Sequence, residues 1–329
     1  MTDAAKAGDG FCALVGDIGG THARLALAEF HDGKPVISDI REFPSPAYSN
    51  GRDIVRDYLS QTALKPQPQT AAIAVAGPIT NGSVHFTNLG WALSENDLRE
   101  LGFAKARLLN DFEALALSIR HLSPGDLHRL GAAQSGVSNA TVAVIGPGTG
   151  FGASALVRNG TVAVAMAAEG GHASFAPGDD VERDVLRVIA RRHSHVSIER
   201  ILSGPGLLNL HAALNEIESV SADAGSPAEI TGRALNGEPH CRRTVLRFCA
   251  ILGSVAGDFA LYYGARGGMF IAGGIAPSIV PILEMSDFRR RFEAKGRFNV
   301  YLAPIPTQIV MHAHPAFLGA AEIAWQMSA

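Results

Sequence analysis

The sequence predicts a protein of mixed strands and helices, built from two halves of similar architecture. The chain has 329 residues, enough for two domains of roughly 100–200 residues each. A buried strand, a glycine turn and a second strand follow one another twice, and at an offset of 130 residues Gly16 and Gly20 fall on Gly146 and Gly150. Long apolar runs, typical of central strands, also alternate with helical patterns. The alternative is that glycine-turn hairpins simply resemble one another.

The first half reads as a meander of strands followed by alternating helices and strands. A hairpin signal at 31–34 joins two of the strands. Ser94 can cap a helix because Asp97 follows three residues later. The expected strands cover 11–20, 22–30, 35–43, 71–77 and 82–88 and one that ends at 109, and the expected helices cover 50–62, a segment from 94, and 111–122.

The second half begins after a polar, glycine-containing stretch at 122–139, which is a candidate domain boundary. Residues 141–167 read as three strands joined by turns, and 178–263 are mostly helical in pattern. A strand then meets the glycine turn at 272–275, and a late strand at 308–314 precedes a final helix at 315–327.

Composition excludes several classes of protein. Hydrophobic residues make up 47% of the chain and charged residues 18%, so the chain can bury a large core and is not intrinsically disordered. The 28 basic and 31 acidic residues give a net charge of −3, without the basic excess that suits nucleic acid or an anionic membrane. The longest apolar run, 248–257, is about half a membrane span. With three scattered cysteines and no signal-peptide pattern, we expect a cytoplasmic protein without nucleic-acid or membrane partners.

The first glycine turn has the composition of an anion site. It comprises Gly16, Asp17, Ile18, Gly19, Gly20 and Thr21. Glycines allow successive backbone N–H groups to point into one concavity. An aspartate there would repel a bare phosphate, so its presence implies a bridging cation, for which Mg²⁺ is the usual choice. The alternative is a plain turn in which Asp17 makes a local hydrogen bond.

Two further glycine turns could also approach phosphates. One spans 146–152 and contains Gly148, Thr149 and Gly150. The other contains Gly273 and Gly274 and opens a helix, and a helix N-terminus suits the phosphates or ribose of a nucleotide. Each could instead be a close-packing corner.

A third set of residues suits a ligand rich in hydroxyl groups. Asn110 and Asp111 stand where a strand gives way to a helix, and Glu169 and His172 share the turn EGGH. Carboxylates and an amide can exchange hydrogen bonds with hydroxyls, and one carboxylate can also take a proton. Glu199 is a further candidate acceptor. The alternatives are a helix cap, a structural histidine and a solvated helix face.

Taken in order, these motifs resemble the bacterial glucokinase family over about 11–325. The resemblance rests on GDIGGTHARLAL (16–27), AIAVAGPI (72–79), LLNDFEALA (108–116), GPGTGFG (146–152), EGGH (169–172), SIERILSGPGL (197–207) and FIAGGI (270–275). It implies a two-domain α/β, actin-like (ribonuclease H-like) ATPase fold, with ATP and sugar in the interdomain cleft. It also implies ATP-dependent phosphorylation of glucose at the 6-hydroxyl, and a cytoplasmic, homodimeric enzyme.

The resemblance further implies roles and boundaries. Residues 16–21 and 148–150 become two phosphate loops, Gly273 and Gly274 fall in the adenosine segment, and Asp17 acts on Mg²⁺ through water. The sugar contacts become Asn110, Asp111, Glu169, His172 and Glu199, with Asp111 as general base. The small domain would cover 1–121 and 312–329, and the large domain 122–311. His22 stands where the family commonly has asparagine.

Two rival readings remain. Related kinases of the repressor/open-reading-frame/kinase group, which use other hexoses or N-acyl hexosamines, often carry a cysteine-rich zinc motif after the ExGH histidine. Here ASFAPGDDVER follows His172, without a cysteine. The other rival, a non-catalytic actin-like ATP-binding module, gives no reason for the Asn-Asp and EGGH motifs.

Overall fold

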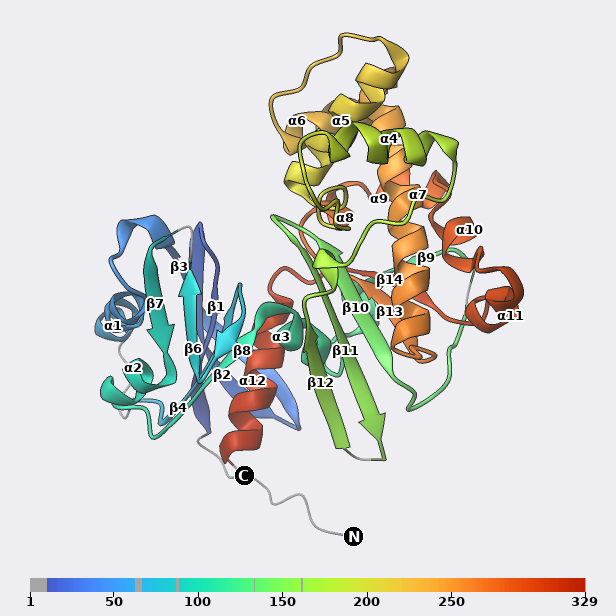
Figure 1. The fold of residues 1–329 in the computed structure, drawn as a ribbon. Helices are drawn as coiled ribbons and strands as arrows, with labels where there is room; N and C mark the ends of the chain where they lie inside the picture. The colour runs from blue at the N-terminus through green and yellow to red at the C-terminus, as the bar shows by residue number, and fades with distance from the viewer. Residues whose placement is uncertain (1–10, 63–66, 87–88, 133, 161, 329) are drawn as a thin grey trace. The chain divides into compact units, whose positions relative to one another are not determined.

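A computed structural model of the chain describes residues 11–62, 67–86, 89–132, 134–160 and 162–328 (Figure 1). Its contacts divide the chain into two compact units. The first comprises Met1–Ser123 and His312–Ala329, and the second Pro124–Met311. Each unit has its own sheet and its own hydrophobic core.

The first unit is built on a five-stranded sheet of order β3-β2-β1-β4-β8. Strands β1, β4 and β8 are parallel, whereas β2 and β3 are antiparallel additions. All residues of β4 are buried, as expected for a central parallel strand. The strands are β1 (Cys12–Ile18), β2 (His22–His31), β3 (Lys34–Pro44), β4 (Thr70–Val75) and β8 (Lys105–Asn110), with a smaller sheet of β5 (Ile79–Thr80), β6 (Ser83–Phe86) and β7 (Trp91–Ser94).

Helices complete the first unit, and local sequence accounts for their ends. They are the 3₁₀ turn η1 (Ser45–Ala47), α1 (Gly51–Gln61), α2 (Glu95–Glu100), α3 (Asp111–Ser118) and α12 (Pro315–Ser328). The predicted capping box of α2 is present, with the Ser94 and Asp97 side chains each accepting the other residue's backbone N–H. The distant C-terminal helix α12 packs on α3, β1 and β4. Its Gly319 meets the Ala114 carbonyl so closely that a side chain would collide with it.

The second unit repeats this sheet with one extra strand. Its six-stranded order is β12-β11-β10-β13-β14-β9, in which β10, β13 and β14 are parallel and the others antiparallel to their neighbours. The strands are β9 (Leu127–Leu130), β10 (Val142–Pro147), β11 (Phe151–Asn159), β12 (Val162–Ala168), β13 (Gly268–Ile271) and β14 (Thr307–Val310).

The two sheets confirm the predicted internal similarity. In both, a strand is followed by two antiparallel strands on one side and has two parallel strands on the other. Strands β1 and β10 start at Cys12 and Val142, 130 residues apart. The offset seen in the sequence is therefore the offset between two related cores.

Helices of the second unit gather around α7, which runs through its core (Figure 1). They are α4 (Asp180–Ala190), α5 (Gly204–Glu218), α6 (Pro227–Leu235), α7 (Pro239–Tyr262), α8 (Ile275–Ser278), α9 (Val280–Met285), α10 (Phe288–Glu293) and α11 (Asn299–Leu302), with 3₁₀ turns η2 (Pro124–Asp126), η3 (Gly170–His172) and η4 (Gly296–Phe298). By length and composition α7 could cross a membrane, but 72% of its apolar window is buried inside the protein. We therefore interpret α7 as a helix of the protein core.

Candidate active site

In the first unit, two of the predicted motifs follow the parallel strands β1 and β8, between which β4 lies. Ile18 of β1 is in register with Val75 of β4, which is in register with Asn110 of β8. The glycine turn after β1 and Asp111 after β8 therefore lie at the same edge of the sheet. In open α/β sheets, ligands bind outside this carboxyl edge.

Backbone hydrogen bonds and the Ser45 side chain hold the first glycine turn in place. The Gly19 N–H donates to the His22 carbonyl (2.9 Å), and the buried Ser45 hydroxyl donates to the Gly19 carbonyl (2.8 Å). The Ser45 N–H also donates to the Thr21 carbonyl (3.1 Å). At Gly20, by contrast, a side chain would meet nothing within 4 Å. The turn is thus held by its neighbours and open on its outer side.

Asp17 lies inside β1, two residues before Gly19, rather than in the turn itself. Its cross-strand partner is Arg24, whose Nε donates to Glu42 at 2.7 Å. Burial raises the pKa of the Asp17 carboxyl, and the nearby Arg24 guanidinium opposes that rise without cancelling it. Carboxyl groups whose pKa is shifted by burial are common at functional sites.

Asn110 and Asp111 open helix α3, as the sequence predicts. The Asn110 side chain accepts the N–H groups of Phe112 (2.9 Å) and Glu113 (3.3 Å), and the Glu113 carboxylate accepts the Asn110 N–H (3.4 Å). Asp111 Oδ1 also accepts the Phe112 N–H, at 2.9 Å. The Asp111 carboxylate therefore lies at the N-terminus of α3, the positive end of the helix dipole.

In the second unit, the other two glycine turns lie side by side. Ile145 of β10 is in register with Ile271 of β13, and the Ala272 N–H donates to the Ile145 carbonyl at 2.8 Å. A side chain on Gly146 would come within 2.6 Å of the Ala272 carbonyl oxygen. Close packing therefore explains Gly146, while Gly148 and Gly274 have open space at the Cβ position.

Glu199 connects three of the predicted motifs. Its Oε2 accepts the Phe151 N–H at 2.8 Å, at the end of the second glycine turn. Its own N–H donates to the carbonyl of Gly171 in EGGH, at 2.9 Å. A side chain on Gly150 would lie only 2.5 Å from Glu199 Oε2. Glu199 is half-buried and precedes α5, so it is not on a solvated helix face.

Glu169 and His172 stand at the two ends of one 3₁₀ turn, η3. The His172 N–H donates to the Glu169 carbonyl (3.1 Å), and His172 Nε2 lies 3.9 Å from Glu169 Oε2. Both side chains are more than 60% exposed. His195, which the sequence analysis did not single out, hydrogen-bonds the His172 carbonyl through Nε2 at 2.9 Å. It is 23 residues away, and no local pattern predicts that contact.

The predicted residues thus form one group in each unit. The first unit holds the turn at 16–21 with Asn110 and Asp111. The second holds the turns at 146–152 and 272–275 with Glu169, His172 and Glu199.

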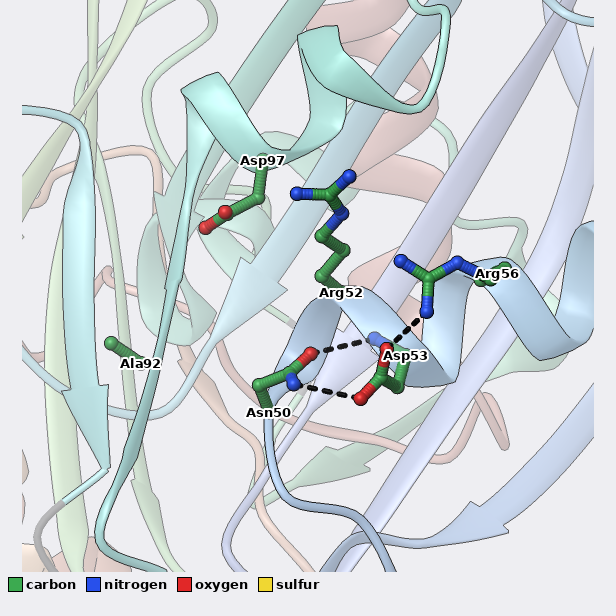
Figure 2. Close-up of a pocket in the computed structure, with 6 residues that line it drawn as sticks. All are labelled: Asn50, Arg52, Asp53, Arg56, Ala92 and Asp97. Atoms are coloured by element: carbon green, nitrogen blue, oxygen red, sulfur yellow. Dashed lines mark hydrogen bonds and ion pairs between the residues drawn. The ribbon is translucent and has the colours of Figure 1, made fainter.

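A separate depression in the first unit contains none of these residues (Figure 2). It has a volume of about 470 Å³ and is lined by Asn50, Arg52, Asp53, Arg56, Ala92 and Asp97. Its charged groups already have partners: Asp53 with Asn50 and Arg56, Arg52 with Glu100, and Asp97 with Ser94. We therefore do not assign it as the active site.

Comparison with known proteins gives a consistent result. Residues 14–327 match the family model described as Glucokinase. The chain is 50% identical over 309 residues to a glucokinase of Caulobacter sp. (strain K31), covering 94% of this chain and 93% of that one. The crystal structure of a glucokinase from an Antarctic psychrotroph superposes with a TM-score of 0.86 at 38% identity, covering 96% of this chain and 99% of that one.

A more distant structure agrees in fold alone. A ROK family glucokinase from Streptomyces griseus, in complex with glucose and AMPPNP, superposes with a TM-score of 0.65 at 17% identity, covering 96% of this chain and 99% of that chain. The chain has the actin-like ATPase fold that its motifs imply. With its family model, its relatives and its fold in agreement, the chain belongs to the glucokinase family.

Proposed function

We propose that this chain transfers the γ-phosphoryl group of ATP to the 6-hydroxyl of D-glucose, giving glucose 6-phosphate. The observation that carries the proposal is the position of Asp111, at the same sheet edge as the Gly19–Thr21 turn. A proton acceptor and a phosphate-binding turn must lie close together for transfer to a hydroxyl. Family membership then selects the substrates.

The three glycine turns bind the phosphates and the nucleoside of ATP. The outer side of the first turn is open at Gly20, and the second is open at Gly148, so backbone N–H groups there can approach phosphate oxygens. Thr149 and Gly150 complete the second turn, and Gly273 and Gly274 take the adenosine side. The Streptomyces griseus structure, which holds AMPPNP, supports ATP as the donor.

Asp17 fits a site for Mg²⁺ that the nucleotide itself completes. The described residues contain no cluster of three or more histidine, cysteine, aspartate or glutamate residues able to hold a metal. Mg²⁺ commonly binds to one or two carboxylates, several waters and the phosphates of the substrate. One half-buried carboxylate beside an open turn meets that need. When bound, Mg²⁺ would neutralise phosphate charge.

The sugar contacts come from both groups of residues. Asp111 accepts the proton of the 6-hydroxyl, and the Phe112 N–H at its Oδ1 holds the carboxylate in place. Asn110, Glu169, His172 and Glu199 bind the other hydroxyls. The hydrogen bond from the Phe151 N–H leaves Glu199 with a fixed orientation, so its second oxygen can accept a sugar hydroxyl without reorganisation.

We further propose a cytoplasmic homodimer that binds neither nucleic acid nor membrane. The net charge of −3 and the burial of α7 support the last two points.

A coupled assay with ATP and a panel of hexoses tests the proposal. Glucose should give the highest kcat/KM, and the product should be oxidised by a dehydrogenase specific for glucose 6-phosphate. Mannose, glucosamine, fructose and N-acetylglucosamine complete the panel. Preference for an N-acyl hexosamine would establish the rival kinase reading, and ATP binding without turnover of any hexose would establish the non-catalytic one.

A further inference from the structure

A side chain from another loop holds the backbone of His172. His195 Nε2 lies 2.9 Å from the His172 carbonyl oxygen. Because a carbonyl oxygen only accepts hydrogen bonds, Nε2 must carry the hydrogen. His195 belongs to the loop between α4 and α5 and is exposed. A histidine outside the EGGH turn thus donates to the residue that the proposed function places on the sugar.

The carbonyls on either side of His172 are bonded differently. The Gly171 carbonyl accepts the Glu199 N–H at 2.9 Å. The Ala173 carbonyl accepts the Ile198 N–H, also at 2.9 Å. Both are bonds between backbone groups, which a change of side chain leaves in place. Of these three successive carbonyls, that of His172 alone is bonded by a side chain, so its bond depends on the residue type at the donor.

Close packing restrains the glycines of the EGGH turn. A side chain on Gly171 would collide with the Phe151 carbonyl oxygen of β11, and one on Gly170 would collide with the Phe259 ring. The His172 side chain, by contrast, is 64% exposed, so packing does little to fix it. Its position depends on the backbone that carries it, and the bond from His195 is one of the restraints on that backbone.

We propose that His195 is a positioning residue for glucose, acting through His172. The inference deepens the proposed function and rests on it, because it takes His172 as a ligand of a sugar hydroxyl. That hydroxyl does not react, so the interaction is present in the ground state and in the transition state alike. Loss of the restraint should therefore raise the KM for glucose and leave kcat nearly unchanged.

The nucleotide side of the second unit has restraints of its own. The Gly204 N–H donates to the Gly148 carbonyl at 2.8 Å, and the Glu199 carboxylate accepts the Phe151 N–H. Neither bond involves the side chain of His195. The KM for ATP should therefore stay close to the wild-type value when His195 is changed.

Two amides of different length test the bond. A glutamine at position 195 places an N–H donor at about the reach of the histidine Nε2, whereas an asparagine is one methylene shorter and reaches only as far as Nδ1. We expect His195→Gln to keep the wild-type KM for glucose. We expect His195→Asn to raise it about 3- to 10-fold, the range of one lost hydrogen bond. A role in packing alone would not separate two amides at an exposed position.

His193→Asn is the matched control. His193 lies two residues earlier in the same loop, but it lines a separate shallow depression beside α4 and α5. Its KM for glucose should equal that of the wild type. Calorimetric titration with glucose, without ATP, gives the same comparison in the absence of turnover. The Kd of His195→Asn should rise by the same factor as its KM, and hydrogen exchange at 169–172 should be faster than in His195→Gln.

The possible outcomes separate this inference from the proposed function. A wild type that does not phosphorylate glucose contradicts the proposed function, and the inference falls with it. In an active enzyme, the same KM for glucose in both amide variants, whether raised or unchanged, overturns the inference alone. A parallel rise in the KM for ATP also overturns it, because the unit as a whole would then be loosened. If circular dichroism shows that His195→Asn is unfolded, His195→Phe, which keeps a ring without the N–H, decides: a raised KM for glucose supports the inference and a wild-type KM overturns it.

Discussion

Asp111 has a structural role and a proposed chemical role, and the two roles depend on different properties of its side chain. Its Oδ1 accepts the Phe112 N–H at the start of α3, a bond that an asparagine can keep. Proton acceptance requires the carboxylate. We therefore expect Asp111→Asn to fold and bind glucose but to lose about 10²–10⁴-fold in kcat, the range of a positioned general base.

Glu113→Gln is the matched control for this change. Glu113 lies two residues further along α3, and its carboxylate accepts the Asn110 N–H in the capping box, a task that glutamine also performs. Its kcat should stay close to that of the wild type. Near-normal turnover in a folded Asp111→Asn protein would remove Asp111 from the role of base.

Asp17 gives a prediction in which stability and activity move in opposite directions. Its pKa is raised by burial above the ordinary 3.8, so the folded state binds its proton more tightly than the unfolded state does. Stability therefore falls as pH rises through the window between 3.8 and the raised value, and the cost is complete above that window. Asp17→Asn has no charge to bury and should unfold at a higher temperature than the wild type at pH 7.

The same variant should lose most of its turnover while binding glucose normally without ATP, if Asp17 serves the metal. Calorimetric titration with glucose and thermal melts between pH 3.5 and 8 check both parts. The gain in melting temperature should shrink as pH falls toward 3.8. Parallel loss of glucose binding would instead make Asp17 a sugar ligand or a fold determinant.

At the scale of elements, a buried ion cluster joins three helices of the second unit. Glu182 of α4 is fully buried, and its carboxylate accepts the Gly178 N–H (2.6 Å) and hydrogen bonds from Arg247 of α7 (3.1 Å) and Arg291 of α10 (2.9 Å). Removing Glu182 takes the fully buried carboxylate from the cluster and leaves Arg247 and Arg291 to pair with the 40% exposed Asp179. We expect Glu182→Ala to destabilise the second unit by about 3–5 kcal/mol.

Asp184→Ala, in the same helix, is the control. Asp184 pairs with Arg187 at the surface, where both side chains are substantially exposed, and its loss should cost no more than about 1 kcal/mol. Both tryptophans, Trp91 and Trp325, lie in the first unit, so urea unfolding should be followed by far-ultraviolet circular dichroism. Equal shifts for the two variants would show that the cluster contributes no special stability.

Elements with strong local signals could be predicted from the sequence. The hairpin at 31–34 has its two central residues, Asp32 and Gly33, at positive φ, as the Asp-Gly pair demands. The capping residues Ser94 and Asn110 also lie where the pattern put them. Strands β7 and β9 are not predicted from the sequence, because β7 (WALS) ends at a helix cap and β9 (LHRL) lies in the polar stretch at 122–139, so neither has an apolar run like that of β13. Their pairing with β6 and β14 defines them as strands.

The features of the candidate site likewise divide into those with a local sequence signal and those without one. The glycine turns and helix caps are formed by residues close together in the sequence, so sequence patterns predict them. The bond from the Phe151 N–H to Glu199 spans 48 residues, and the contact of His195 with the His172 carbonyl spans 23. Such contacts depend on how the whole unit folds, so no window of sequence contains them.

At the scale of the whole molecule, the proposal makes glucose a ligand of both units. Asn110 and Asp111 belong to the first unit, and Glu169, His172 and Glu199 to the second. A ligand can shift the equilibrium between two conformations only by the difference between its affinities for them. If both groups bind the same sugar, saturating glucose should slow hydrogen exchange at 108–112 and at 169–172 together, without ATP.

His172→Ala separates a shared site from two independent effects. His172 is 64% exposed, so its loss should leave the second unit folded while weakening sugar binding. Under a shared site, protection at 108–112 in the other unit should decline along with protection at 169–172, with the same glucose dependence. Two independent sites would leave 108–112 protected as in the wild type. Protection in only one unit of the wild type would likewise contradict the assignment of these five residues to one sugar, because a glucose molecule bound by both groups must slow exchange in both.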